Sequence, residues 1–365
     1  MALPHALADK SRIDEEALAA ARSAGLVYVC DDQLKILRMR AGSGFTYRSG
    51  DGRTVRDRKT LDRIRSLAIP PAWTDVAICP LPQGHIQAVG RDAKGRKQYR
   101  YHPWWREVRD EDKYEHMLDF ARALPAIRRR VAADMAKPGL SREKVLATVV
   151  ALLEATLIRV GNAEYAEQNK SYGLTTLRNR HAAIHGSELR FEFKGKSGKI
   201  WRLKIKDRRI ARIVHACQSL PGQHLFQYED DEGQRRDFTS SDVNAYLRDI
   251  TGADVTAKDF RTWAGTVMAA SVLCDAEPSK TQTMAKRTVK AAIEQVATRL
   301  GNTVTICRKC YVHPQVVECY VSGVLSREIK KSRKAVDGLD EGETAVLAML
   351  ERRLAAVKRS DRAAA

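Results

Sequence analysis

The chain has 365 residues, and 64 Lys and Arg against 45 Asp and Glu give it a formal net charge of +19 at pH 7. A surplus of this size favours a polyanionic partner, because clustered cations release the counterions of a phosphate backbone, although a ribosomal or other generic basic protein would have the same composition. No apolar run reaches the roughly 18 residues of a membrane-spanning helix, and Met1–Lys10 lacks the apolar core of a secretory signal. Seven cysteines without an export signal favour a reducing cytoplasm, so neither a membrane protein nor a secreted one is expected.

The first third of the chain predicts a short extension and then a β-rich domain. Residues 1–24, rich in Ala and in charges of both signs, are expected to form a frayed or helical N-terminal extension. Residues 25–108 carry mostly strand and turn signals, among them the β-prone run Leu26–Val29, with one helix around Leu61–Leu67 that ends before Pro70. Two hairpins are predicted from runs that flank a polar turn: Phe45–Arg48 and Thr54–Val55 around Ser49–Gly52, and His85–Gly90 and Lys97–Tyr101 around Arg91–Arg96.

The rest of the chain predicts helices. After a linker near Arg106–Lys113, residues 113–365 are expected to form a mainly helical domain, in which Ser141 is a suitable N-cap for an apolar helix that reaches Ile158. One β-hairpin interrupts it, because apolar and charged residues alternate from Leu189 to Ile205 around a Gly-Lys-Ser-Gly turn. Further helices are expected through Val243–Leu247, Trp263–Leu273, Val289–Leu300 and Glu341–Val357. The predicted fold class is therefore α+β, with a small β-rich N-terminal domain and a larger, mainly α-helical domain that contains a β-hairpin.

Five positions in the helical part carry candidate chemistry, although each also has a simple structural interpretation. Arg159 would close an apolar helix, where a cation suits the helix dipole, and Lys196 would lie at a solvated hairpin tip. Lys258 and Arg261 would share a solvated helix face one turn apart. The remaining two positions are the Gly-Asn pair at Asn302, which suits a helix C-cap, and Tyr311, which follows two cations and precedes a proline.

The order and spacing of these residues are more specific than any one of them. An Arg, a hairpin Lys, a Lys-x-x-Arg and a Gly-Asn pair are followed, nine residues after Asn302, by Tyr311. This order resembles the type IB DNA topoisomerases, in particular the compact poxvirus-like branch found in bacteria. The resemblance covers about Gly25 to Leu325, and its matching stretches are GRDAKGRKQYRYH, LIRVGNAEYAEQNKSYGLTTLRNRH, FKGKSGK, AKDFRTWAGT and LGNTVTICRKCYVHP.

The resemblance implies an enzyme that closes as a clamp around double-stranded DNA and relaxes supercoils through a transient 3′-phosphotyrosyl bond. It implies that Tyr311 is the nucleophile, that Arg159 and Arg261 clamp the phosphate and that Lys196 is the general acid. Asn302 stands where the poxvirus enzymes carry a histidine, and because only histidine exchanges a proton near neutral pH, we expect Asn302 to act by hydrogen bonding. The resemblance also implies that Lys258 relays the proton or binds phosphate. It implies DNA contacts for Tyr165, Gln98, Tyr99 and Tyr101.

This residue set suits phosphodiester chemistry. Guanidinium groups stay charged at any working pH and match the equatorial oxygens of a transition state that gathers negative charge. Tyrosine, with an ordinary pKa of about 10, needs nearby cations to favour its phenolate, and the departing deoxyribose oxygen needs a proton. Since the covalent bond stores the energy of the broken one, no ATP, metal or other cofactor is expected. We further expect a monomer that works on supercoiled DNA in the cytoplasm, at the nucleoid.

Three alternatives remain open from the sequence. Cys307, Cys310 and His313, with Cys319 nearby, mimic the spacing of a zinc site, although a single Cys-x-x-Cys is weak support for one. A tyrosine recombinase would share the Arg, Lys, Arg and Tyr, but such enzymes typically show His-x-x-Arg where this chain has Lys258 and Arg261. A non-catalytic DNA- or RNA-binding protein would explain the charge without the ordered set of residues.

Overall fold

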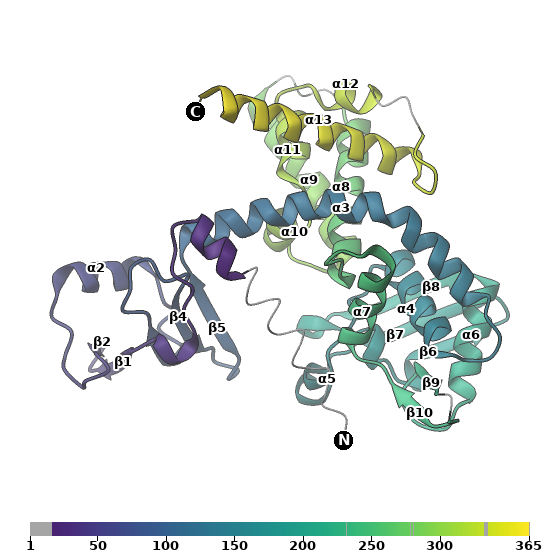
Figure 1. The fold of residues 1–365 in the computed structure, drawn as a ribbon, viewed down its shortest axis with the longest axis horizontal. Helices are drawn as coiled ribbons and strands as arrows, with labels where there is room; N and C mark the ends of the chain where they lie inside the picture. Colours follow the sequence, from purple (N-terminus) through teal and green to yellow (C-terminus); the bar gives the residue numbers. More distant parts are fainter. Residues whose placement is uncertain (1–16, 231, 278, 280, 332–334, 365) are drawn as a thin grey trace. The chain divides into compact units, whose positions relative to one another are not determined.

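The computed structural model describes residues 17–364 except 231, 278, 280 and 332–334 (Figure 1). The chain divides into two compact units, Met1–Glu115 and His116–Ala365, and the boundary falls inside the long helix α3 (Pro103–Met135). The linker expected near Arg106–Lys113 was therefore wrong, because this segment is part of a continuous helix. Its Arg, Glu and Lys residues favour a helix, and it contains no Gly or Pro that would end one. None of the described helices is long and apolar enough to cross a membrane.

The N-terminal unit is built on a five-stranded antiparallel sheet with strand order β2-β1-β3-β4-β5. The hairpin predicted around Arg91–Arg96 is confirmed as β4 and β5, and its turn is held by Asp92, whose carboxylate accepts the N–H groups of Lys94 and Arg96. The helix expected around Leu61 is α2 (Arg58–Ser66). The strands are β1 (Ile36–Ala41), β2 (Gly44–Arg48), β3 (Thr74–Ile78), β4 (Ile86–Arg91) and β5 (Lys97–Tyr101).

One sequence prediction in this unit was wrong, and another is confirmed only in part. The run Leu26–Val29 forms no strand, only an isolated bridge from Val27 to Gly84; Leu26 and Val29 are apolar because they are buried in the core. The hairpin predicted around Ser49–Gly52 is present in short form: Arg48 bridges to Thr54, and the N–H of Val55 donates to the carbonyl of Tyr47 at 2.8 Å. The full partner of β2 is β1, which was not predicted although Arg38 and Arg40 alternate with apolar residues along it.

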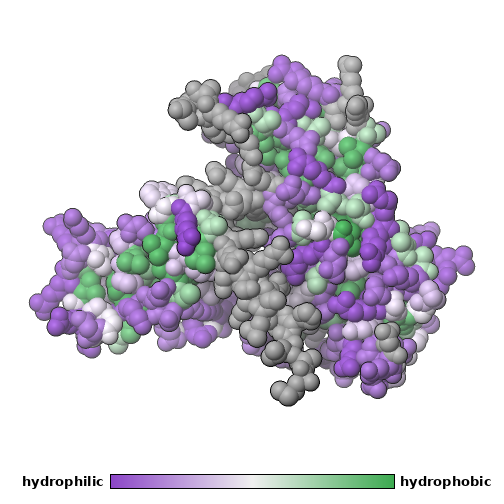
Figure 2. Space-filling view, viewed as in Figure 1, coloured by the Kyte–Doolittle hydropathy of each residue, from purple (hydrophilic) through white to green (hydrophobic). Residues whose placement is uncertain are grey.

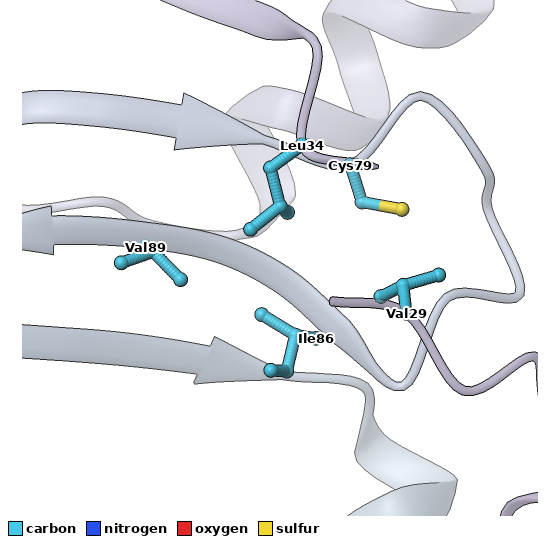
Figure 3. Packing of buried hydrophobic residues seen from close by; sticks show 5 residues of the cluster. All are labelled: Val29, Leu34, Cys79, Ile86 and Val89. Carbon is cyan, nitrogen blue, oxygen red and sulfur yellow. The ribbon is translucent and has the colours of Figure 1, made fainter. Parts of the chain in front are cut away.

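The core of the N-terminal unit lies on both faces of its sheet. One cluster joins Val29, Leu34, Cys79, Ile86 and Val89, which point toward one another in Figure 3. The other places Ile64 of α2 against strand residues. Residues 17–23 are helical and bury Ala17 and Ala21 against Leu26 and Trp105, so the described part of the extension is packed rather than frayed.

The second unit confirms the mainly helical prediction. Ser141 is the N-cap of α4 as expected, with its side chain accepting the N–H of Lys144. Helix α8 lies at the centre, because it packs against α4, α7, α9, α11, α12 and α13. Figure 2 shows that hydrophilic residues cover most of the coloured surface on the visible face. The helices are α4 (Arg142–Thr156), α5 (Ala163–Asn169), α6 (Arg208–Ser219), α7 (Ser240–Thr251), α8 (Ala257–Asp275), α9 (Gln282–Leu300), α10 (Val304–Cys310), α11 (Pro314–Val321), α12 (Leu325–Lys330) and α13 (Glu341–Ala364).

The predicted hairpin of this unit is confirmed as β7 (Glu188–Lys194) and β8 (Ile200–Lys206). Leu189, Phe191 and Phe193 are buried, while the charged residues between them face solvent. A third strand, β6 (Ala182–His185), extends the sheet in the order β6-β7-β8, and a separate pair joins β9 (Gln227–Glu229) to β10 (Arg235–Asp237). The hairpin positions its turn, a short 3-10 segment at Lys196–Gly198, beyond the end of the sheet.

Candidate active site

Most of the site residues predicted in the second unit line one pocket. Its volume is about 340 Å³. Its walls come from the segment that follows α4, from α5, from the β7–β8 turn, from α8 and from the end of α10. Six of its twelve lining residues were singled out from the sequence: Arg159, Tyr165, Lys196, Lys258, Arg261 and Tyr311. Asn302 is not among the lining residues, but it contacts one of them, as described below.

Arg159 lies on an extended segment that is fixed by backbone contacts. Helix α4 ends at Thr156, with Leu157 in the left-handed conformation, so the expectation that Arg159 closes the helix was wrong. Its carbonyl accepts the N–H of Leu174 at 2.9 Å. Gly161 (φ +110°) and Gly173 pack so closely that a Cβ on Gly173 would lie 2.6 Å from the carbonyl oxygen of Arg159. The backbone under this guanidinium is therefore rigid, and the two glycines make that possible.

Arg261 is buried in α8, with 3% of its surface exposed. One terminal nitrogen donates to the carbonyl of Leu157 and the other to that of Leu300, at 2.6 Å. Its Nε has no partner among the described residues. Burial, and then the neighbouring Arg159, lower the pKa of this guanidinium. The solvated helix face expected for the Lys-x-x-Arg pair is thus wrong for Arg261, while Lys258, three residues earlier, is exposed.

Asn302 follows the C-cap that the sequence predicted. Gly301 ends α9 in the left-handed conformation (φ +64°), and the Asn302 N–H donates to Ala297 at 2.9 Å. The side-chain oxygen of Asn302 accepts a hydrogen bond from Arg159. Its amide nitrogen is buried and has no partner among the described residues. This leaves two N–H donor hydrogens beside the Arg159 guanidinium.

Tyr311 directly follows α10 and is docked on α8. Its ring centre lies 5.1 Å from the Arg261 guanidinium carbon. A Cβ on Gly265 would lie 2.5 Å from the carbonyl oxygen of Tyr311, so only a glycine of α8 lets this segment come so close. The hydroxyl of Thr266 accepts the N–H of His313 at 3.1 Å, which holds the chain on the other side of Tyr311.

Lys196 reaches the same pocket from the hairpin turn. The turn is closed by a hydrogen bond from the Gly195 N–H to the Lys199 carbonyl at 2.8 Å, and Ser197 adopts the left-handed conformation (φ +62°). Lys196 is exposed, and no ion pair or hydrogen bond of its side chain is found among the described residues.

The predicted DNA-contacting residues of the N-terminal unit lie on β5, the edge strand of its sheet. Gln98 donates to the carboxylate of Asp92 at 3.0 Å. The rings of Tyr99 and Tyr101 stack at 5.7 Å; Tyr99 is exposed, whereas Tyr101 is half-buried against the core. The pocket itself is lined only by residues between Arg159 and Tyr311, so these three residues form a separate group.

Sequence reasoning assigned no role to Tyr172 and Trp201. Tyr172 lines the pocket because its backbone N–H pairs with the carbonyl of Lys194, next to the hairpin turn. Trp201 is one of the apolar residues that alternate with charged ones along β8, a pattern that predicts only an ordinary core residue. No local signal identifies either, since both positions depend on contacts between distant segments.

Three cysteines lie near Tyr311 in the sequence, at positions 307, 310 and 319. Cys307 is buried, and burial raises the pKa of its thiol to about 11. Cys310 is half-buried and Cys319 buried, and all three are free thiols. Among the described residues, no group of three or more His, Cys, Asp and Glu side chains is arranged to hold a metal ion.

Comparison with known proteins identifies the family. Residues 102–337 match the family described as "Eukaryotic DNA topoisomerase I, catalytic core", and residues 44–92 match "Bacterial DNA topoisomerase IB, N-terminal domain". The chain is 31% identical over 292 residues to the "DNA topoisomerase 1B" of Acanthamoeba polyphaga mimivirus, covering 78% of this chain and 87% of that protein. It is 21% identical over 267 residues to the "DNA topoisomerase 1B" of Vaccinia virus (strain Copenhagen), covering 72% and 82%. The chain therefore belongs to the type IB DNA topoisomerases, enzymes whose substrate is DNA.

Proposed function

We propose that this enzyme relaxes supercoiled double-stranded DNA by a transesterification at Tyr311. The phenolic oxygen attacks a backbone phosphorus, the bond from that phosphorus to the 5′-oxygen breaks, and a 3′-phosphotyrosyl bond forms while a 5′-hydroxyl is released. The observation that carries this proposal is the pocket in which Tyr311 meets Arg159, Arg261, Lys196 and Lys258. The family membership and the distances around Tyr311 support the same assignment.

Arg159, Arg261 and Asn302 form the proposed phosphate clamp. The negative charge that grows on the non-bridging oxygens needs donors that are already oriented. Arg159 is held by its backbone, Arg261 keeps further N–H groups after its two carbonyl bonds, and the Asn302 amide nitrogen is unpaired among the described residues. Asn302 thus acts as a hydrogen-bond donor and not as a proton carrier, since an amide does not titrate near neutral pH.

Lys196 is the proposed general acid. A deoxyribose oxygen leaves as a strong base unless it takes up a proton, and a lysine on an exposed turn can deliver one from outside the clamp. Lys258, exposed in the first turn of α8, is the second lysine that lines the pocket and would relay the proton or bind a phosphate. Tyr165, exposed at the pocket rim, would contact DNA beside the cut.

The reverse reaction completes the cycle. The phosphotyrosyl bond conserves the energy of the broken phosphodiester, so the 5′-hydroxyl can reseal the strand without ATP. Between the two steps the free end rotates and releases supercoils. We expect the enzyme to do this as a monomer, without a metal, at the nucleoid in the cytoplasm.

The N-terminal unit would supply the second half of a clamp around the duplex. Its edge strand β5 presents Gln98 and Tyr99, which we assign to groove and phosphate contacts, together with the half-buried Tyr101. Tyr99 is more exposed than Tyr101, so it is the better candidate for a direct contact with DNA.

A plasmid relaxation assay in EDTA and without ATP tests the proposal. We expect supercoiled plasmid to become a ladder of relaxed topoisomers with the wild-type chain, and to stay supercoiled with Tyr311→Phe. Relaxation by Tyr311→Phe at a rate near that of wild type would overturn the assignment of the nucleophile. Relaxation by the wild type only after addition of ATP or Mg²⁺ would overturn the proposal that the reaction needs neither.

A further inference from the structure

The indole of Trp201 lies between two glycines that each precede a proposed site residue. Trp201 is the second residue of β8 and is buried, with 7% of its surface exposed. A Cβ on Gly195 would lie 2.7 Å from its pyrrole edge (Cδ1 and Nε1). A Cβ on Gly301 would come closer than 3.0 Å to the other edge of the same indole. Gly195 directly precedes Lys196, and Gly301 directly precedes Asn302.

A second contact joins the same two segments. Lys199, at the other end of the hairpin tip (residues 195–199), donates from its Nζ to the carbonyl of Thr298 near the end of α9, at 3.4 Å. This ammonium also lies 5.6 Å from the centre of the Trp201 ring, over its face. Phe193 stacks on Trp201 at 6.5 Å from within the hairpin. The hairpin tip is thus joined to the C-terminal end of α9 by an aromatic contact and a lysine.

Position 195 must be a glycine because the indole lies against it, and not because its backbone conformation demands one. Its φ of −97° and ψ of −167° are extended values that any residue adopts. The glycine at this position therefore serves the close approach of Trp201. Lys196, one residue further on, has no side-chain partner among the described residues, so the backbone of the hairpin tip sets where its ammonium lies.

We propose that Trp201 is a positioning residue that holds the hairpin tip, and with it Lys196, against the end of α9 beside Asn302. This inference rests on the proposed role of Lys196 as general acid. Without the indole, the hairpin tip loses its only aromatic contact with α9 among the described residues, and the ammonium samples positions from which it cannot reach the leaving oxygen. A displacement of about 1 Å is enough to cost roughly 10²-fold in rate.

The test compares two duplexes that differ in one atom. Both carry a cleavage site mapped on plasmid DNA with the wild-type enzyme, and in one the bridging 5′-oxygen is replaced by sulfur, which leaves as a weakly basic thiolate. Single-turnover formation of the covalent adduct is measured for Lys196→Ala, Trp201→Ala and the double variant. We expect Trp201→Ala to be slower by about 10²-fold on the oxygen substrate and near wild type on the sulfur substrate. The double variant should be no slower than Lys196→Ala.

Gly195→Ala repeats the test with the aromatic core intact, in case Trp201→Ala fails to fold. It should show the same preference for sulfur, and it should add no defect in the Trp201→Ala background, where its Cβ finds room. Phe191→Leu is the matched control, because it removes volume from the same hairpin core away from the hairpin tip. It should leave the ratio of the two rates unchanged.

The outcomes distinguish the role of Lys196 as general acid from the positioning role of Trp201. If Lys196→Ala is not rescued by sulfur, the general acid is assigned wrongly and the inference fails with it. If Lys196→Ala is rescued but Trp201→Ala and Gly195→Ala are equally slow on both substrates, only the positioning role is overturned. The same holds if Phe191→Leu also prefers sulfur, since the effect would then follow from general loosening of the hairpin.

Discussion

The two sides of the pocket are held in different ways. On one side, Arg261 is buried and bonded to two carbonyls, and Arg159 is bonded to Asn302 on a segment locked by two packed glycines. On the other side, Lys196 is exposed at a hairpin tip and has no side-chain partner among the described residues. The first side belongs to the helical core around α8, whereas the second is attached to that core through Trp201 and Lys199.

This difference follows from what each group is proposed to do. Donors that stabilise developing charge act best when they are already oriented, because then no reorganisation is needed during the reaction. A proton donor has to approach a leaving oxygen that arrives with the DNA, so it benefits from a support that can adjust. The rigid side and the adjustable side should therefore respond differently to substitution.

The largest effect is expected at Tyr311, the proposed nucleophile, which is neither a phosphate clamp nor a proton donor. Tyr311→Phe removes one hydroxyl and no packing volume, so cleavage should be abolished while non-covalent DNA affinity stays nearly intact. Adduct formation and a filter-binding titration on the same duplex measure the two quantities. A parallel loss of affinity would indicate that Tyr311 holds DNA rather than attacks it.

Lys196→Ala should slow cleavage by about 10²–10⁴, the usual contribution of a general acid. Because the side chain is exposed, the midpoint of thermal unfolding should not change. The rate is measured in single turnover and the stability by thermal unfolding monitored by circular dichroism. Lys204→Ala, an exposed lysine on β8 paired with Glu188, is the matched control and should leave the rate unchanged. A clear loss of stability in Lys196→Ala would show that the turn is more strongly supported than described.

Arg261→Ala should change both rate and stability. Loss of one preorganised donor slows cleavage by roughly 10²–10³, and sulfur at the 5′ position should not rescue it. The carbonyls of Leu157 and Leu300 lose their partner, so unfolding should also become easier by about 1–3 kcal/mol. Arg202→Ala, which removes an exposed arginine of β8, serves as the control in both assays. A rate defect that sulfur repairs would move Arg261 to the proton-transfer side.

Asn302→Ala should slow cleavage by roughly 10²-fold, the low end for one lost donor, and Asn302→His should keep substantial activity because imidazole also donates. The rates of the two variants are compared across pH 6 to 9. The histidine variant should acquire a pH dependence that the wild type lacks at this position. A wild-type rate for Asn302→Ala would remove Asn302 from the clamp.

The smallest effect is expected at His116, which contacts the first turn of α8, the helix that carries Arg261. His116 of α3 lies 3.4 Å from Asp259, which caps α8 between Lys258 and Arg261. The hydrogen bond to Asp259 raises the pKa of His116, with smaller contributions from Asp254 and Asp119. A raised pKa in the folded state stabilises the fold below the ordinary value of about 6.5, and this contribution is lost as pH rises through the raised value.

His116→Gln should therefore lower the free energy of unfolding by at most about 1 kcal/mol, most below pH 6.5 and least at alkaline pH. Thermal unfolding of both proteins at pH 6 and pH 9 measures it. A difference that is equal at both values would mean that packing, not charge, is what His116 supplies.

Local sequence signals predicted the regular elements better than the irregular ones. The β4–β5 and β7–β8 hairpins and the Ser141 cap were found because turn residues and alternation act over a few positions. Strand β1 was missed even though Arg38 and Arg40 alternate with apolar residues along it. The exit of α4 was misjudged, because a leucine and not a glycine adopts the left-handed cap.

The sequence singled out the candidate site residues, whose roles stay predictions, but it did not predict their geometry. Arg159, Lys196, Arg261 and Tyr311 were identified through their order along the chain, and the structure brings them to one pocket. The burial of Arg261, its bonds to two helix ends and the contact of Trp201 with Gly301 join segments more than 30 residues apart. Such contacts depend on the complete fold, which local propensity does not encode.

Locating the covalent bond tests the central claim most directly. The wild-type enzyme is trapped on a duplex in which the short fragment downstream of the cut, which carries the released 5′-hydroxyl, diffuses away after cleavage. The adduct is digested with protease and nuclease, and the modified peptide is mapped by mass spectrometry. We predict a nucleotide joined through its 3′-phosphate to Tyr311 and to no other residue. A nucleotide on Tyr165 or Tyr172, the other tyrosines that line the pocket, would contradict the account, and so would relaxation of plasmid without any trapped adduct.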